Sequence, residues 1–523
     1  MTAEVCLLDL TARLLRHADS TVATVPGQAT RTYRQLHDDV KRLAARLGGA
    51  GLRPGMRVGV WMANSYEWLV ADLSLLELRC ISVALPVEAA QDGLAAEVKR
   101  LGLHAVLCDP GDAPDETWAW RGGGDGAGFA PRAVPFEERT DLAVPAWTFS
   151  SGTTGRLRCI ETDRRGVEAL VSIIGETFRV DDQDRFLLFL PMHSFQQRFL
   201  LYATLWHGVH VTITEPRHLL TAMVAAGPTL LIAPPSLFEA MARRVTALPP
   251  RQRWALRVGL GLARLLPAGL ASRLRRALGR PLREALGGRT RLLISGMAPI
   301  SESALATFER LGMPITEVYG MTECGMIAWN TASERRLGAV GRPLRDARVT
   351  LGDDGEVLVQ RSAQPTRRYL FEDEAADGTY RGDGLIATGD LGRLDADGYL
   401  YLTGRKKNIV VTATGEKLSP EPLEAELRAI PSVDHAVFVQ RGGRLAVVCR
   451  VDAGADAAAV TRAVSARLQD ARNGLSAAEV VVTAEPFTVA SGIITANLKV
   501  RRDALAARFF DGQLPAHAGG GAP

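Results

Sequence analysis

The sequence is poor in lysine, in aromatic residues and in regularly spaced cysteines. Only six of its 62 basic residues are lysines, and aromatic residues make up 6% of the chain. Its six cysteines show neither Cys-x-x-Cys spacing nor the Cys/His spacing of a zinc site. We therefore expect reduced, buried thiols, as in cytoplasmic proteins, and neither disulfides nor a structural zinc ion.

Long apolar runs are also lacking. No run reaches the roughly 18 residues that a membrane-spanning helix needs. The first residues include Glu4 and Asp9 and no basic leader, so we expect no signal peptide and a cytoplasmic location. A net charge of +4 over 523 residues argues against an extended nucleic-acid surface. A hydrophobic content of 47% at this length predicts a globular protein with two or more domains.

A stretch of hydroxyls and glycines stands at residues 147–155, Trp-Thr-Phe-Ser-Ser-Gly-Thr-Thr-Gly. Apolar residues up to Phe149 predict a buried strand, and a helical pattern resumes near Gly166. Strand, small-residue loop and helix is the order that suits a bound polyphosphate, because glycine admits the oxygens and free N–H groups donate to them. The spacing is not that of P-loop NTPases. Taken alone, the stretch is equally compatible with an ordinary Ser/Thr-rich surface turn.

Four further stretches follow in a fixed order. They are Tyr-Gly-Met-Thr-Glu at 319–323, Thr-Gly-Asp at 388–390, Thr-Gly-Arg at 403–405 running on to Gly-Glu-Lys at 415–417, and Gly-Ile-Ile-Thr-Ala-Asn-Leu-Lys at 492–499. Together with the loop, they resemble the adenylate-forming superfamily of acyl-CoA synthetases, peptide-synthetase adenylation domains and luciferases. The resemblance covers nearly the whole chain and is strongest to long-chain fatty acyl-CoA ligases, whose last motif also reads Gly-x-x-Thr-x-x-Leu-Lys.

The resemblance implies an AMP-forming ligase that uses ATP and Mg²⁺. A carboxylic acid, fatty or aryl, would be activated as an acyl-adenylate with release of pyrophosphate, and then passed to CoA. One alternative is an adenylating ligase of secondary metabolism that passes the acid, or a small oxyacid, to an amine or a carrier-protein thiol. A second alternative is a nucleotide-binding relative without catalysis. The residues around His193 include no aspartate to hold a substrate ammonium, which argues against an α-amino acid.

The resemblance also assigns roles to individual residues. Lys499 is expected to bridge the attacking carboxylate and the α-phosphate, and the scarcity of lysine supports this role. Glu323 is expected to hold Mg²⁺, Thr322 to reach the α-phosphate, and Tyr319 to stack on adenine. His193 is the candidate at the carboxylate and the thiol tunnel, with a structural histidine as the alternative. The remaining candidates for nucleotide contact are Ser150, Ser151, Gly152, Thr153, Thr154, Gly155, Arg158, Gly296, Ala298, Gly320, Asp390, Arg405 and Lys417.

Two segments depart from the family pattern. After the two threonines the family continues Gly-x-Pro-Lys-Gly, whereas this chain reads Gly-Arg-Leu-Arg-Cys at 155–159. Arg158 keeps the cation but not the shape of the lysine. The segment 361–369 lacks the glycine-containing pattern that the family has there, and the sequence offers no explanation.

Helix and strand patterns alternate over residues 1–110 and predict layered α/β sheets with flanking helices. The resemblance implies a large N-terminal domain over 1–403 and a small mobile α+β lid over 404–512. The lid is expected to turn about Lys407, and residues 513–523 to form a disordered tail. Asn64 is expected to cap a helix. The arginine-rich block at 236–289 is expected to be a solvated helical insertion, with peripheral attraction to anionic lipid as the alternative.

Overall fold

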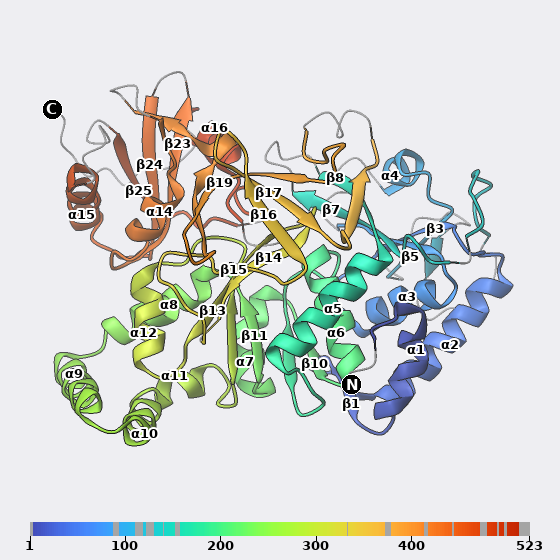
Figure 1. Cartoon of the computed structure of the whole chain (residues 1–523), viewed down its shortest axis with the longest axis horizontal. Helices are drawn as coiled ribbons and strands as arrows, with labels where there is room; N and C mark the ends of the chain where they lie inside the picture. Colours follow the sequence, from blue (N-terminus) through green and yellow to red (C-terminus); the bar gives the residue numbers. More distant parts are fainter. Residues whose placement is uncertain are drawn as a thin grey trace.

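The computed structural model describes residues 4–86, 94–109, 119–121, 130–139, 141–151, 157–331, 333–371, 378–412, 417–441, 444–470, 478–488, 491–495 and 499–511. Within these ranges the chain forms a large α/β domain built on extended sheets and a small α+β domain at the C-terminal end (Figure 1). This arrangement confirms the predicted fold class.

The first large sheet has seven strands. In spatial order they are β18 (Thr366–Tyr369), β8 (Leu157–Thr162), β7 (Ala146–Ser151), β4 (Ile81–Ala84), β3 (Arg57–Trp61), β5 (Ala105–Cys108) and β6 (Ala119–Arg121). β7 and β8 run antiparallel, with Ser150 opposite Arg158. The helix predicted near Gly166 is confirmed as α5 (Arg164–Phe178), but the expected order of strand, loop and helix is wrong, because β8 lies between the loop and α5. Because two strands flank the loop, no helix N-terminus lies next to it in sequence.

The second large sheet has nine strands and carries the 319–323 motif. In spatial order they are β15 (Arg342–Pro343), β14 (Gly325–Asn330), β13 (Ile315–Met321), β12 (Leu292–Ser295), β11 (Leu230–Ala233), β9 (Arg185–Leu188), β10 (His210–Ile213), β1 (Thr21–Thr24) and β2 (Arg31–Thr32). The strands from β13 to β1 are parallel. β9 ends at Leu188, three residues before the predicted end at Pro191.

Helices cover both large sheets. They are α1 (Leu10–Arg13), α2 (Tyr33–Gly49), α3 (Tyr66–Glu77), α4 (Leu94–Arg100), α5, α6 (Phe195–His207), α7 (Leu219–Ala226), α8 (Pro235–Thr246), α9 (Pro250–Leu265), α10 (Ala268–Leu278), α11 (Arg280–Ala285) and α12 (Glu302–Arg310). One apolar core joins the two sheets through α3, α5 and α6. The Ser65 side chain accepts from the N–H of Trp68 and caps α3, so the predicted cap at Asn64 is wrong.

Three smaller sheets complete the part of the chain that the structure describes. The first contains β16 (Ala347–Leu351), β17 (Glu356–Arg361), β19 (Ile386–Leu394) and β20 (Leu400–Arg405), and leads through the 3₁₀ turn η5 (Lys406–Asn408) to the short pair β21 (Val410–Val411) and β22 (Lys417–Leu418). The small domain contains α14 (Glu421–Leu427), β23 (Val433–Arg441), β24 (Arg444–Val451), α15 (Ala457–Asp470), β25 (Glu479–Thr483) and α16 (Arg502–Phe510). Its three-stranded sheet has its own apolar clusters on both faces, as an independently packed domain requires.

The boundary at residues 403 and 404 and the pivot at Lys407 stay predictions, and the predicted tail at 513–523 lies outside the described residues. Within the described part of the chain, no helix combines the length and apolarity needed to cross a bilayer.

Candidate active site

Tyr319, Asp390 and Arg405 meet where β13 of the nine-stranded sheet approaches the β19–β20 hairpin. The Tyr319 hydroxyl donates to Asp390 Oδ2 at 2.8 Å. Arg405 lies opposite Asp390 on the neighbouring strand, and its Nε lies 2.9 Å from Asp390 Oδ1. Burial disfavours the charge of Arg405, but Asp390 and its neighbours leave the pKa of the guanidinium raised. Each carboxylate oxygen of Asp390 keeps room for a further donor, as ribose hydroxyls would require.

Glu323 lies in the tight turn between β13 and β14. Its carboxylate is nearly buried, at 6% exposure, and its Oε1 accepts from the Tyr369 hydroxyl at 2.8 Å. The Thr366 hydroxyl donates to the backbone carbonyl of Glu323. The buried Arg361 side chain donates to the carbonyls of Cys324 and Met326 and pairs with Asp346 at 2.6 Å. The turn is thus held from the 361–369 segment.

Gly320 is needed in the same hairpin for a steric reason. A Cβ at Gly320 would stand 2.4 Å from the carbonyl oxygen of Gly325, so no larger residue fits where the strands turn. The register also shifts between Tyr319 and Gly320. This tight turn presents Thr322 and Glu323 side by side.

Arg158 connects the glycine loop to this turn. Its guanidinium carbon lies 5.1 Å from the centroid of the Tyr369 ring, the same tyrosine that donates to Glu323. Of the predicted loop residues, Ser150 is buried at the end of β7, and Ser151 is the last residue of that strand. Gly152, Thr153, Thr154 and Gly155 lie outside the described residues.

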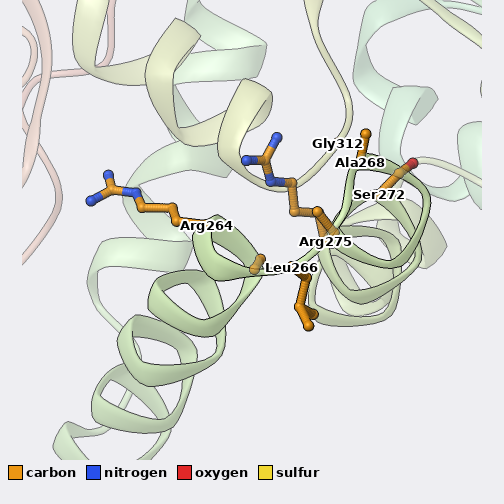
Figure 2. Close-up of a pocket in the computed structure, with 8 residues that line it drawn as sticks. Arg264, Leu266, Ala268, Ser272, Arg275 and Gly312 are labelled. Atoms are coloured by element: carbon orange, nitrogen blue, oxygen red, sulfur yellow. The ribbon is translucent and has the colours of Figure 1, made fainter.

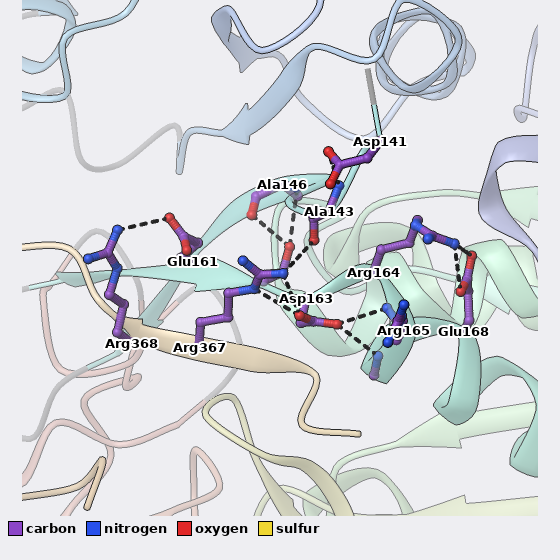
Figure 3. A network of polar contacts seen from close by, with 12 residues as sticks. Asp141, Ala143, Ala146, Glu161, Asp163, Arg164, Arg165, Glu168, Arg367 and Arg368 are labelled. Carbon is purple, nitrogen blue, oxygen red and sulfur yellow. Dashed lines mark hydrogen bonds and ion pairs between the residues drawn. The ribbon is translucent and has the colours of Figure 1, made fainter. Parts of the chain in front are cut away.

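Ion pairs fasten β18 to β8 and α5 (Figure 3). Arg367 Nε donates to Asp163 Oδ2 at 2.8 Å, while Asp163 Oδ1 accepts from the N–H of Arg165 at 2.9 Å and caps α5. Arg368 pairs with Glu161 at 3.5 Å. The Asp163 carboxylate therefore both caps α5 and holds β18, the strand that carries Tyr369.

Lys499 joins this group from the small domain. Its backbone N–H donates to the Thr495 hydroxyl at 3.2 Å and its carbonyl accepts from the Thr495 N–H at 2.8 Å, which forms a tight turn. The amine interacts electrostatically with Arg405, Glu323 and Asp390. Burial, followed by Arg405, lowers the pKa of the amine, and the two carboxylates oppose that shift. Lys499 therefore lies within electrostatic range of three residues that stand 94 to 176 positions before it in the chain.

His193 follows β9 on the loop before α6. Burial lowers the pKa of its imidazole to about 4, so the ring is neutral at pH 7. Asn64 holds this loop: it donates to the Leu190 carbonyl at 2.9 Å and accepts from the Met192 N–H at 2.9 Å. In the first turn of α6, the Gln196 amide lies 3.5 Å from the Thr322 hydroxyl, which places the histidine loop beside the Glu323 turn.

The turn after β12 carries Gly296 and Ala298 and is contacted by the small domain. Arg428 of the small domain donates to the Pro299 carbonyl at 2.9 Å and pairs with Glu239 of α8 at 3.0 Å. A Cβ at Gly296 would lie 3.2 Å from the Val318 carbonyl oxygen, so β13 packs closely against this turn.

Lys407 and Lys417 stand apart from this group. Lys407 is exposed in η5, between Lys406, which pairs with Asp354 at 2.7 Å, and Asn408, which donates to Glu421 at 2.6 Å. Lys417 is exposed on β22, and within the described ranges it has no hydrogen bond or ion pair to the other candidates. Their assigned roles stay predictions.

Sequence reasoning missed Tyr369, Thr366, Arg361 and Gln196, and it assigned Asn64 to a helix cap instead of the loop after β9. Each acts through a partner far away in the chain, so no local pattern marked them. A separate hollow of about 460 Å³ lies between α9 and α10, away from the candidate site (Figure 2).

Comparison with known proteins identifies the family. The AMP-binding enzyme model matches residues 10–364. A long-chain-fatty-acid–CoA ligase of Mycobacterium bovis is 27% identical, with 91% of this chain and 90% of the relative aligned. The structure of MatB from Rhodopseudomonas palustris with ATP bound superimposes with a TM-score of 0.74 at 22% identity and covers 97% of this chain and 99% of MatB. An amide bond synthetase mutant from Marinactinospora thermotolerans gives a TM-score of 0.72 at 21% identity, covering 96% and 99%.

The two structures share the fold, and the family model spans more than half of the chain, including the glycine loop, the histidine loop and the Glu323 turn. The chain is therefore an enzyme that belongs to the AMP-binding family of AMP-forming ligases.

Proposed function

We propose that this protein activates a carboxylic acid with ATP as an acyl-adenylate and transfers the acyl group to the thiol of CoA. The observation that carries the proposal is the binding of Asp390 by both Tyr319 and Arg405, with Lys499 of the small domain within electrostatic range of this carboxylate. Two cations, Lys499 and Arg405, near two carboxylates suit a reaction in which charge moves between a phosphate and a carboxylate. The relation to a long-chain-fatty-acid–CoA ligase supports a fatty acid as the substrate.

In the first half-reaction, a carboxylate oxygen of the acid attacks the α-phosphorus of ATP. The new P–O bond forms as the bond to the β-phosphate oxygen breaks, and pyrophosphate leaves with that electron pair. Lys499 offsets the negative charge that builds on the α-phosphate and the attacking oxygen. Asp390 accepts from the ribose hydroxyls while Arg405 holds the Asp390 carboxylate in place. Thr153 and Thr154 are assigned to the leaving phosphates by their place in the motif.

Glu323 suits the role of a Mg²⁺ ligand. Mg²⁺ is commonly held by one or two carboxylates together with substrate phosphates, and the described residues contain no cluster of three or more candidate metal ligands. One oxygen of Glu323 is oriented by Tyr369, and the carboxylate sits beside Thr322. When bound, the ion would neutralise phosphate charge.

In the second half-reaction, the CoA sulfur attacks the acyl carbonyl carbon, and AMP leaves with the oxygen to which the acyl group was bound. The thiol proton goes to solvent or to the departing phosphate. Lys499 serves only the first step, so the small domain turns about Lys407 and withdraws the lysine before CoA arrives. The neutral imidazole of His193 lies on the loop beside Thr322 and is assigned to the acyl carbonyl and the thiol path.

The test is pyrophosphate release with ATP and a panel of fatty, aryl and small oxyacids, each with and without CoA. A fatty-acid signal that becomes multiple-turnover only with CoA is expected. Pyrophosphate release by none of the acids, despite ATP binding, would refute the proposal and favour a nucleotide-binding protein without catalysis.

An amine acceptor is the second candidate, supported by the shared fold with an amide bond synthetase and by the altered loop at 155–159. Turnover with an amine and without CoA, with an amide detected by mass spectrometry, would favour this candidate. A carrier-protein thiol is tested in the same assay by replacing the amine with a phosphopantetheinylated carrier.

A further inference from the structure

The helices α9 and α10 form a hairpin at the edge of the large domain. Figure 1 shows the hairpin projecting at the lower left, in green, beyond α8, α11 and α12. Pro267 precedes α10 and separates the two helices. The arginine-rich block predicted to be helical is thus confirmed, and its surface is open to a partner.

α9 has two apolar faces on opposite sides. On the inner face, Leu256 and Leu260 pack against the core beneath the nine-stranded sheet, and Ala263 is buried. The outer face carries Trp254 (68% exposed), Val258 (41%), Leu262 (53%) and Leu265 (82%). These four residues recur every three or four positions and therefore form one stripe along the helix. The inner face already satisfies the packing of α9, so the outer stripe is not needed for the fold.

Positive charge surrounds this stripe. The arginines of the hairpin and its exit are Arg251, Arg253, Arg257, Arg264, Arg273, Arg275, Arg276 and Arg280. Within the described residues, Arg280 is the only one of these paired with a carboxylate, that of Glu284 at 2.7 Å. An exposed apolar stripe beside polar or charged residues is typical of a surface that binds a partner.

The charge is concentrated in this segment. Residues 240–283 contain eleven arginines and no aspartate, glutamate or lysine, whereas the whole chain has a net charge of only +4. The rest of the chain therefore has a net charge of −7. The molecule is consequently polarised, with an attractive surface for anions at the hairpin and a repulsive one over the remainder.

A hollow of about 460 Å³ opens between the two helices and Gly312, as Figure 2 shows. Arg264, Arg275 and Ser272 contribute polar groups to its lining, and Leu266 and three alanines contribute alkyl surface. Guanidinium and hydroxyl donors beside alkyl groups match the boundary between a lipid phosphate and its acyl chains.

We propose that the α9–α10 hairpin docks on a bilayer surface that contains anionic lipid. The Trp254–Leu265 stripe enters the boundary between head groups and acyl chains, and the arginines lie at the phosphates. Each basic residue near such a surface strengthens binding by about five-fold. Docking itself does not depend on the proposed function. If the substrate is a fatty acid, docking also brings the enzyme to the phase where that acid accumulates.

The test is flotation of the full-length protein with vesicles of phosphatidylcholine alone or of phosphatidylcholine mixed with phosphatidylglycerol. Two hairpin variants remove one feature each: Trp254→Ser with Leu265→Ser, and Arg257→Glu with Arg264→Glu. The control, Arg462→Glu with Arg467→Glu, makes the same change in charge at two exposed residues of α15 in the small domain. Unchanged thermal melting and unchanged turnover of a water-soluble acid establish that each variant is folded.

We expect binding to the anionic vesicles at least about ten-fold stronger than to the neutral ones, weakening as salt rises. Both hairpin variants should lose about ten-fold or more, and the α15 variant much less. Equal binding to both vesicle types, no binding, or an equal loss in the α15 variant would overturn the proposal. A dimer in analytical ultracentrifugation that disappears with Trp254→Ser and Leu265→Ser would instead assign the stripe to a second copy of the chain.

Discussion

Arg428 of the small domain forms an ion pair with Glu239 of the large domain, with 3.0 Å between Nε and Oε2. Glu239 is 2% exposed, and its other oxygen accepts from the Ser301 N–H at 2.9 Å. The same guanidinium donates to the Pro299 carbonyl, directly after the turn that carries Gly296 and Ala298. Removing the ion-pair partner of a buried carboxylate is costly, so this contact favours the present orientation of the small domain, in which Lys499 lies within electrostatic range of Glu323.

We expect Arg428→Ala to slow the adenylation half-reaction by at least about ten-fold, because Glu239 would keep only the Ser301 N–H. Transfer from a preformed acyl-adenylate to CoA should be affected less, since that step needs a different orientation. Both rates are measured by rapid quench. Arg441→Ala, which removes an exposed pair with Asp511 at 3.0 Å, is the control within the same domain. Equal losses in the two half-reactions would show that the ion pair does not select an orientation.

Lys499→Ala should reduce adenylation by roughly a hundred- to a thousand-fold, the usual cost of removing a preorganised charge from a transition state. Conversion of a supplied acyl-adenylate to the thioester should stay within about three-fold of wild type if the lysine serves the first step only. Lys99→Ala, an exposed lysine of α4, controls for loss of a positive charge. A large loss in both steps would assign Lys499 to overall folding or to both reactions.

Tyr369→Phe removes the hydroxyl that donates to Glu323 at 2.8 Å. We expect the Mg²⁺ concentration for half-maximal activity to rise about three- to ten-fold, because the carboxylate loses the donor that orients it. The matched control is Tyr380→Phe, whose ring packs on Tyr369 and whose hydroxyl lies 2.8 Å from that of Thr366. A Mg²⁺ dependence that shifts equally in both variants would point to general loosening of the turn.

The stability of the large domain should depend on pH through Glu317 of β13. Burial raises the pKa of its carboxyl to about 7, although the Asn330 amide donates to it at 3.0 Å. The folded protein therefore keeps a proton that the unfolded chain has lost above about pH 4.5, and stability falls as pH rises from there to about 7. Glu317→Gln should remove up to about 3 kcal/mol of this decline, measured by urea unfolding across that range. Glu334→Gln, at an exposed position, should leave the decline intact.

Local rules explain what could be predicted from the residues alone. The strand at Leu292–Ser295, the hairpin around 395–398 and the helical block after residue 236 all follow from short-range periodicity and turn residues, and the structure confirms them. The same rules failed at Asn64, because Ser65 next to it caps a helix equally well. Asn64 instead donates to the segment that follows β9, and this contact leaves Ser65 as the cap of α3. They failed again after Gly155, because antiparallel pairing of β7 with β8 depends on the rest of the sheet.

The sequence by itself determined the residue types of the candidate site: Tyr319, Glu323, Asp390, Arg405 and Lys499 stand in recognisable short motifs, since each motif must form a particular turn or strand end. Only the tertiary structure decided what holds them. Tyr369 reaches Glu323 across 46 positions, and Arg428 reaches Glu239 across 189. Contacts at such separations leave no periodicity in the chain, because their geometry arises only when sheets and domains pack. Tertiary packing also decided which face of α9 is exposed. Leu256 and Leu260 pack against the core, and Trp254 and Leu265 on the opposite face therefore lie in solvent.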